Sequence, residues 1–144
     1  MECIFCAIAR GEASALVVYQ DEETMAFMDI NPATPGHTLV IPRAHVRNIY
    51  ELDDHTAAAI MNTVLRVARG IREAMEPDGL NLMQANERAA FQSVFHFHFH
   101  LVPRWTGDGL RPPWRPKPGE PLAIADAAER IRRALAAEGS GEPG

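Results

Sequence analysis

The sequence lacks long hydrophobic runs, any excess of positive charge and all but two cysteines, and each shortage excludes a class of protein. No run of about 18 apolar residues occurs, so we expect no membrane span and no membrane partner. A basic start followed by an apolar run is missing, so we expect no secretory signal and a cytoplasmic location. The net charge of −5 argues against nucleic acid as a partner but allows a local pocket for a small anion.

The two cysteines, Cys3 and Cys6, lie too close together in the chain to staple a fold. In a reducing compartment such a CxxC pair is typical either of half a metal site or of a redox pair. A redox pair is expected at a helix start inside a βαβ pattern, whereas this pair opens the chain. Its position favours metal binding, with redox chemistry as the alternative.

The length of 144 residues fits one compact domain with a real core, and the hydrophobic periodicity predicts its elements. We expect strands over 16–19, 24–30, 38–41, 80–85 and 94–102, and helices over 3–9, 53–75 and 122–137. The short link between the last two strands favours an antiparallel sheet and an α+β fold. We therefore divide the chain into a main domain (1–110), a proline-rich arm with a C-terminal helix (111–138), and a disordered tail (139–144).

The most informative segment is VFHFHFHLVPR, residues 94–104. Side chains alternate between the two faces of a strand, so His96, His98 and His100 are predicted on one face. The three intervening phenylalanines, at positions 95, 97 and 99, would then bury the other face. The histidine array is open to three interpretations: a solvated polar face, metal ligation, or nucleophilic and acid–base chemistry at phosphorus.

Polar residues just upstream favour the phosphorus chemistry. Asn86, Gln92 and Ser93, with nearby backbone N–H groups, would make a plausible cradle for a phosphate group beside the histidines. Taken alone they are ordinary loop residues, and only the neighbouring histidines give them weight.

Several motifs in the same order resemble the histidine-triad (HIT) family, in the bacterial form that opens with CxxC. They are the triad preceded by Gln92-Ser93-Val94, the opening Cys3-Ile-Phe-Cys6, Phe27-Met-Asp29-Ile30-Asn-Pro32, and Pro35-Gly-His37-Thr-Leu-Val-Ile-Pro42-Arg-Ala-His45. The resemblance runs from residue 3 to about 109. It departs where many members have two glycines, which are replaced here by Arg88 and Phe91.

This resemblance implies a HIT-like fold with a five-stranded antiparallel sheet, a long central helix at 53–75 and a C-terminal helix. The family usually forms a two-fold dimer whose sheets join edge to edge, so a homodimer is expected.

The resemblance also implies a reaction at the α-phosphate of a purine nucleotide. His98 would be the nucleophile that forms a nucleotidyl-histidine intermediate, and His100 would contact the phosphate and assist the leaving group. Gln92, Ser93 and Asn86 would contact phosphate, and Asp29 would bind the ribose hydroxyls. The base would lie between four apolar side chains, Phe5, Ile8, Phe27 and Ile30.

A structural zinc site is the second implied feature. Its ligands would be Cys3, Cys6, His45 and His96, four soft donors with no open position. This leaves His98 free for nucleophilic attack. His37 and His55 have no assigned role, and we interpret them as a loop residue and an exposed helix residue.

The leaving group stays open at this point. A nucleoside phosphoramidase is the favoured reading, and a dinucleoside polyphosphate (Ap4A-like) hydrolase is the alternative. A different class, a non-catalytic nucleotide-binding protein stabilised by zinc, is also compatible with the residues.

Overall fold

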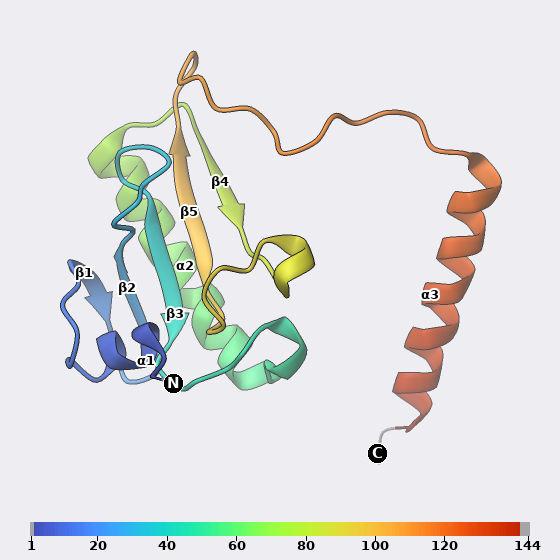
Figure 1. Ribbon diagram of the computed structural model, residues 1–144, viewed down its shortest axis with the longest axis horizontal. Helices are drawn as coiled ribbons and strands as arrows, with labels where there is room; N and C mark the ends of the chain where they lie inside the picture. Colours follow the sequence, from blue (N-terminus) through green and yellow to red (C-terminus); the bar gives the residue numbers. More distant parts are fainter. Residues whose placement is uncertain (1, 142–144) are drawn as a thin grey trace. The chain divides into compact units, whose positions relative to one another are not determined.

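The computed structural model describes the backbone of residues 2–141 and the side chains of residues 2–138. The chain divides into two units, one ending at Gly109 and the other beginning at Leu110. The first unit is an α+β domain with a five-stranded antiparallel sheet in the order β1-β2-β3-β5-β4 (Figure 1), as the sequence predicts. Its strands are β1 (Val17–Gln20), β2 (Thr24–Met28), β3 (Thr38–Pro42), β4 (Gly79–Met83) and β5 (Phe99–Arg104), and its longer helices are α1 (Ile4–Ala9) and α2 (Asp54–Met75).

The long helix α2 covers one face of the sheet because its apolar residues recur at helical spacing. Asp53 caps it, with a side-chain oxygen accepting the Thr56 N–H at 2.7 Å. The helix ends at Met75, and the following residue, Glu76, caps it in a left-handed conformation. A core cluster forms between the helix and the sheet; its members are Ile60, Val64, Val67 and Ile71 of α2 with Ala26, Val40, Phe97 and Leu101. Each large aliphatic side chain buried here contributes about 1.5–3 kcal/mol.

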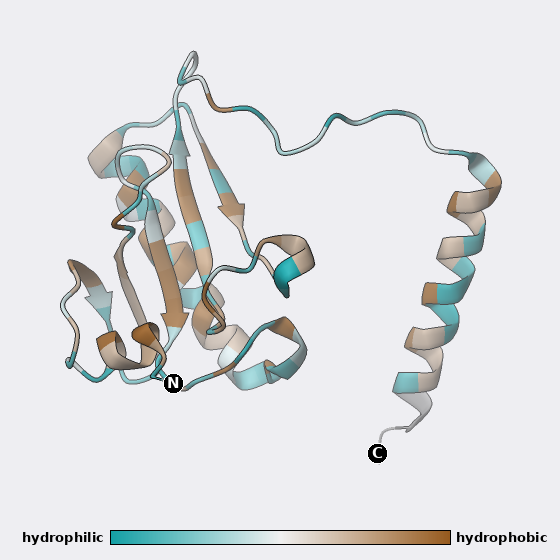
Figure 2. Cartoon of the chain, in the orientation of Figure 1, coloured by the Kyte–Doolittle hydropathy of each residue, from teal (hydrophilic) through white to brown (hydrophobic). Residues whose placement is uncertain are grey.

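The opposite face of the sheet is covered by α1, because β2 and β3 alternate their apolar side chains between the two faces. Met25, Phe27, Leu39 and Ile41 pack with Phe5, Ile8 and Ala9 in a second cluster. After the threonine that begins each strand, apolar residues therefore continue to the end of β2 and of β3 (Figure 2). This packing fixes α1, and with it both cysteines, against the middle of the sheet.

The last strand is shorter than the sequence predicts. β5 begins at Phe99, where the ladder to β3 starts with the pair Val40 and Phe99, whereas the alternation predicts a strand from Val94. The preceding residues run beside the 46–48 segment, since the Phe97 N–H donates to the Val46 carbonyl at 2.6 Å. Phe97 enters the core as predicted. Phe95 does not, because its ring lies 4.4 Å from the Arg47 guanidinium carbon.

The second unit contains a segment without helix or strand over residues 110–120, followed by helix α3 (Pro121–Gly141). The Glu120 carboxylate caps α3 by accepting the N–H groups of Leu122 and Ala123. The helix extends past its predicted end at residue 137, and so it overlaps the start of the predicted tail. Residues 142–144 of that tail lie outside the described residues. Within the described part of the chain, no helix has the length and apolarity needed to cross a membrane.

Candidate active site and metal centre

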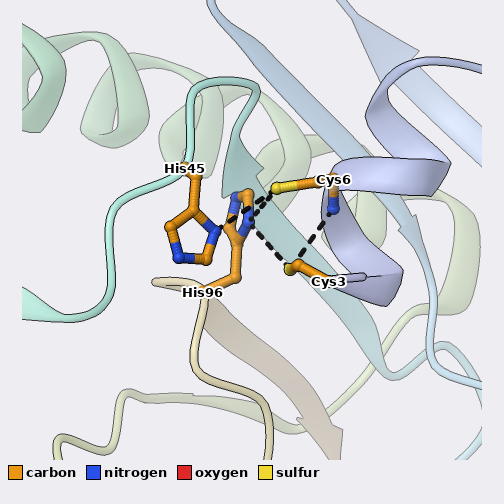
Figure 3. A group of neighbouring side chains, drawn as sticks. All are labelled: Cys3, Cys6, His45 and His96. Atoms are coloured by element: carbon orange, nitrogen blue, oxygen red, sulfur yellow. Dashed lines mark hydrogen bonds between the residues drawn. The ribbon is translucent and has the colours of Figure 1, made fainter. Parts of the chain in front are cut away.

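Four residues from three separate segments of the chain form a cluster at the start of α1 (Figure 3). The Cys6 Sγ lies 3.3 Å from the His45 Nδ1 and 3.5 Å from the His96 Nδ1, and the Cys3 Sγ lies 3.4 Å from the same His96 atom. All four possible ligand atoms lie within 4.8 Å of one another. The cluster joins α1 to the segment after β3 and to the segment before β5.

The hydrogen bonds of His96 suit a metal ligand. Its Nε2–H donates to the Pro42 carbonyl at 2.7 Å, which leaves the Nδ1 lone pair directed at the two thiols. Metal-ligating histidines usually donate their second ring N–H in this way, because the hydrogen bond fixes the ring and the tautomer. Burial lowers the pKa of His96 to about 4, so the imidazole stays neutral. Two thiols and two imidazoles that converge on one point fit a closed tetrahedral site.

The same segment holds His98 in a single tautomer. The His98 Nδ1–H donates to the His96 carbonyl at 2.7 Å, so the lone pair is on Nε2. Burial lowers the pKa of His98, which favours the unprotonated ring. The ring of Phe5 meets it edge-on, with centroids 5.1 Å apart. His98 is therefore a buried imidazole with one free nitrogen.

A second group of side chains links His100 to β2 and to the loop before β3. The Ala33 N–H donates to the His37 Nδ1 at 2.9 Å, so the His37 proton must be on Nε2. That N–H lies 2.9 Å from the His100 Nδ1 and 3.4 Å from an Asp29 carboxylate oxygen. His100 therefore accepts at Nδ1 and carries its own proton on Nε2.

His37 belongs to the candidate site, and sequence reasoning missed it. The sequence analysis interpreted it as a loop residue with no assigned role. In the structure it is only 6% exposed and contacts His100 directly. The available signal was its position immediately before the buried strand β3, where a polar residue needs a partner. His55 is exposed on α2 as expected, and its Nε2 contacts the Glu23 carboxylate.

A cavity of about 400 Å³ opens beside these histidines. Eight of the residues predicted to bind nucleotide line it: Phe5, Ile8, Phe27, Asp29, Ile30, Ser93, His98 and His100. Three of them, Phe5, Ile8 and Phe27, also belong to the core beneath α1, whereas Ile30 is 90% exposed at the rim. The cavity thus has an apolar wall, one carboxylate and two imidazoles.

The other two predicted phosphate contacts lie in a hydrogen-bonded loop outside this cavity lining. The buried Gln92 amide donates to the carbonyls of Arg47 and Val94, and its oxygen accepts the Glu87 N–H at 2.8 Å. The Asn86 oxygen accepts the Ile49 N–H at 2.9 Å. These side chains hold the loop that carries Ser93, and their contact with phosphate stays a prediction.

Comparison with known proteins agrees with this geometry. The chain matches the model of the HIT domain over residues 10–107 and therefore belongs to the HIT family. It is similar to the crystal structure of a HIT-family protein from Bacillus subtilis, with 40% identity and a TM-score of 0.85 over 92% of this chain and 96% of that chain.

Two further relatives bear on chemistry. Adenosine 5'-monophosphoramidase hnt1 of Schizosaccharomyces pombe is 36% identical over 132 residues, which is 91% of this chain and 96% of the relative. A zinc-bound histidine-triad protein from Mycobacterium smegmatis is 40% identical, with a TM-score of 0.73 over 99% of each chain.

Proposed function

We propose that this protein hydrolyses purine nucleotides at the α-phosphate through a nucleotidyl intermediate on His98, and that its leaving group is an amine. The observation that carries the proposal is the His98 ring, locked by its hydrogen bond to the His96 carbonyl and lining the cavity with the free nitrogen available. A neutral imidazole held in this way is a nucleophile that needs no further activation. The phosphoramidase name of the relative from S. pombe supports the choice of an amine.

The reaction has two steps. In the first, the His98 Nε2 forms a bond to the α-phosphorus while the bond from phosphorus to the leaving group breaks. In the second, water attacks the phosphorus, the bond to Nε2 breaks, and a nucleoside monophosphate is released. The His96 carbonyl stabilises the positive charge that His98 carries in the intermediate, because it accepts the Nδ1–H throughout.

His100 would serve the leaving group. Its Nε2–H is directed away from His37, and the ring lies 4.8 Å from that of His98, centroid to centroid. Burial and the neighbouring histidines lower the pKa of His100 to about 4 in the free protein. A bound phosphate anion would raise this pKa, so a proton taken up at His100 can pass to the departing amine.

The remaining cavity residues would select the nucleoside. The Asp29 carboxylate would accept the ribose hydroxyls, and the base would contact the apolar wall formed by Phe5, Ile8, Phe27 and Ile30. Ser93 lies on the cavity beside His98 and would steady the phosphate. Gln92 would act chiefly by holding the loop backbone, and Asn86 likewise.

A hydrolysis panel tests the proposal. Adenosine and guanosine phosphoramidates, dinucleoside polyphosphates and adenylyl sulfate are compared by kcat/KM, with product identity read by chromatography. We expect nucleoside monophosphate from the phosphoramidates with the highest kcat/KM. Preferred cleavage of dinucleoside polyphosphates would replace the amine by the alternative leaving group, and no turnover of any substrate would favour a nucleotide-binding protein.

Replacing His37 with phenylalanine should lower kcat by about 10-fold or more and change KM little. The substitution removes the N–H that fixes the His100 tautomer, whereas the nucleoside contacts remain. An activated ester such as a p-nitrophenyl nucleotide should show a smaller loss, because its leaving group departs without a proton. Equal losses on both substrates would contradict this role, and His37→Gln, which keeps a donor, should recover part of the activity.

We also propose that zinc occupies the Cys3, Cys6, His45 and His96 cluster. The donor chemistry and the His96 hydrogen bond support the ion, as does the zinc-bound relative from M. smegmatis. When bound, zinc would supply structural cross-linking of α1 to the sheet, with no position left for substrate. It would take no direct part in the chemistry at His98 and His100.

The cytoplasmic location stays a prediction.

A homodimer is proposed as the working form. Strand β4 lies at one edge of the sheet, and most of its residues are exposed. An exposed edge of this kind can pair with a second copy. Light scattering at assay concentration measures the mass directly.

A further inference from the structure

The short loop beside the candidate site contains two residues in a conformation that L-amino acids rarely adopt. Glu87 and Phe91, which flank a single 3₁₀ turn (Arg88–Ala90), have φ values of 73° and 70°. Three backbone bonds close this turn: Ala90 and Gln92 donate to the Glu87 carbonyl, and Phe91 donates to the Arg88 carbonyl. Phe91 is therefore held in the left-handed region, which normally favours glycine or asparagine.

The Phe91 side chain is not buried in a way that would offset this strain. The residue is 84% exposed, so burial does not offset the unfavourable backbone conformation. Glu87 differs, because its carboxylate pairs with Arg47 at 2.9 Å and accepts from Asn48. A strained residue with an exposed aromatic side chain, two residues from the cavity-lining Ser93, is a candidate for a ligand contact.

The loop leads directly to the candidate site. Ser93, two residues after Phe91, lines the cavity together with His98. Phe91 does not line the cavity itself, but two residues of chain span at most about 7 Å, so its side chain is within reach of a group bound beside Ser93. In the proposed reaction the nucleoside would contact β2 and α1, and in-line attack would expel the leaving group on the face of the phosphorus away from the His98 Nε2.

Charge on the loop fits a leaving group that is flat or anionic. Arg88 is exposed, and its guanidinium carbon lies 5.8 Å from the Phe95 ring centroid. Among residues 2–138 it forms no ion pair, in contrast to Arg47, which pairs with Glu87. The loop therefore presents to solvent one exposed ring and one positive charge that forms no ion pair within residues 2–138.

We propose that Phe91 is a specificity-determining residue that stacks on an aromatic ring in the leaving group, with Arg88 contributing attraction to any negative charge that this group carries. The inference rests on the proposed hydrolysis through His98 and deepens it by naming the class of leaving group. Two sources could supply the ring: an aromatic amine joined directly to the α-phosphate, or the second base of a dinucleoside polyphosphate.

The test compares two adenosine phosphoramidates whose amines have similar size, one from benzylamine and one from cyclohexylmethylamine. Wild-type protein should favour the aromatic amine by about 2- to 10-fold in kcat/KM, the range expected for one stacking contact. Phe91→Asn, which tolerates the left-handed backbone, should abolish this preference without lowering the melting temperature. Phe91→Tyr should restore it. The unsubstituted phosphoramidate, which releases ammonia, should be hydrolysed equally by all three.

Further measurements separate the outcomes. Dinucleoside polyphosphates are assayed in parallel. If Arg88→Ala lowers kcat/KM for these substrates alone, the second base is the source of the ring. Equal kcat/KM values for the two phosphoramidates in wild type would overturn the inference and leave the His98 chemistry intact. A preference for the aromatic amine that persists in Phe91→Asn would do the same. A change in molecular mass caused by Phe91→Asn also overturns it, because the ring would then be a subunit contact. If no substrate is turned over, the proposed function fails. The stacking contact is then tested by calorimetry, and equal affinities for the two phosphoramidates would overturn it as well.

Discussion

Replacing His98 with alanine is expected to lower kcat by about 1,000-fold or more, the largest effect of any single substitution in this protein. The loss is this large because the substitution removes the atom that becomes bonded to phosphorus, not one contact among several. The ring is buried and hydrogen-bonded to the His96 carbonyl, which fixes the position and tautomer of the nucleophile. His100→Ala should cost less, since it leaves the nucleophile in place.

Mass spectrometry makes this prediction specific. Wild-type protein quenched during turnover should carry one nucleoside monophosphate, and peptide mapping should locate it at His98. The His98→Ala protein should carry none while keeping its affinity for nucleoside monophosphate. Substantial turnover by His98→Ala, or a label on another residue, would remove the covalent mechanism. A wild-type protein that binds nucleotide and never becomes labelled would instead be a binding protein.

Loss of the metal is expected to produce the largest effect on stability. Purified protein should contain about one zinc ion per chain, and a strong chelator should lower the melting temperature by about 10 °C or more. The physical reason is that the short helix α1 connects to the rest of the domain through this cluster as well as through its apolar face. His45→Ala should reproduce the effect, whereas His55→Ala, an exposed histidine outside the cluster, is the matched control and should not.

The same experiment reports on the active site. Phe5 lies between the two cysteines, and its ring contacts both His96 and His98, with centroids 5.9 and 5.1 Å apart. Release of the metal should therefore loosen the position of His98 and reduce kcat moderately, in proportion to the fraction of metal lost. Metal analysis that finds no ion, with both thiols free and the fold intact, would contradict the zinc site and return CxxC to its redox interpretation.

Periodicity and residue spacing were enough to predict most of the fold. The i, i+4 and i+7 pattern of Ile60, Val64 and Val67 placed α2 within one residue of its observed start, because a helix that covers a sheet must repeat its apolar side chains in this way. The uninterrupted apolar run from Leu39 to Ile41 likewise predicted a central strand. The family resemblance, which the CxxC and triad motifs carried, implied the four residues that cluster in the structure.

Only the tertiary structure decided which ring nitrogens of these histidines carry a proton and which are left to act as a nucleophile or a metal ligand. Alternation along a strand placed the three histidines on one face, but β5 starts only at Phe99, and it is the carbonyl of His96 that sets the tautomer of His98. His37 lies 63 residues from His100, so no local pattern could show that their ring nitrogens meet at 2.9 Å. Phe91 was visible in the sequence only as a missing glycine, and its left-handed backbone and exposed ring appear once the hydrogen bonds of the loop are known. Sequence determines elements because their periodicity is local, whereas proton positions and backbone strain depend on partners that only folding brings together.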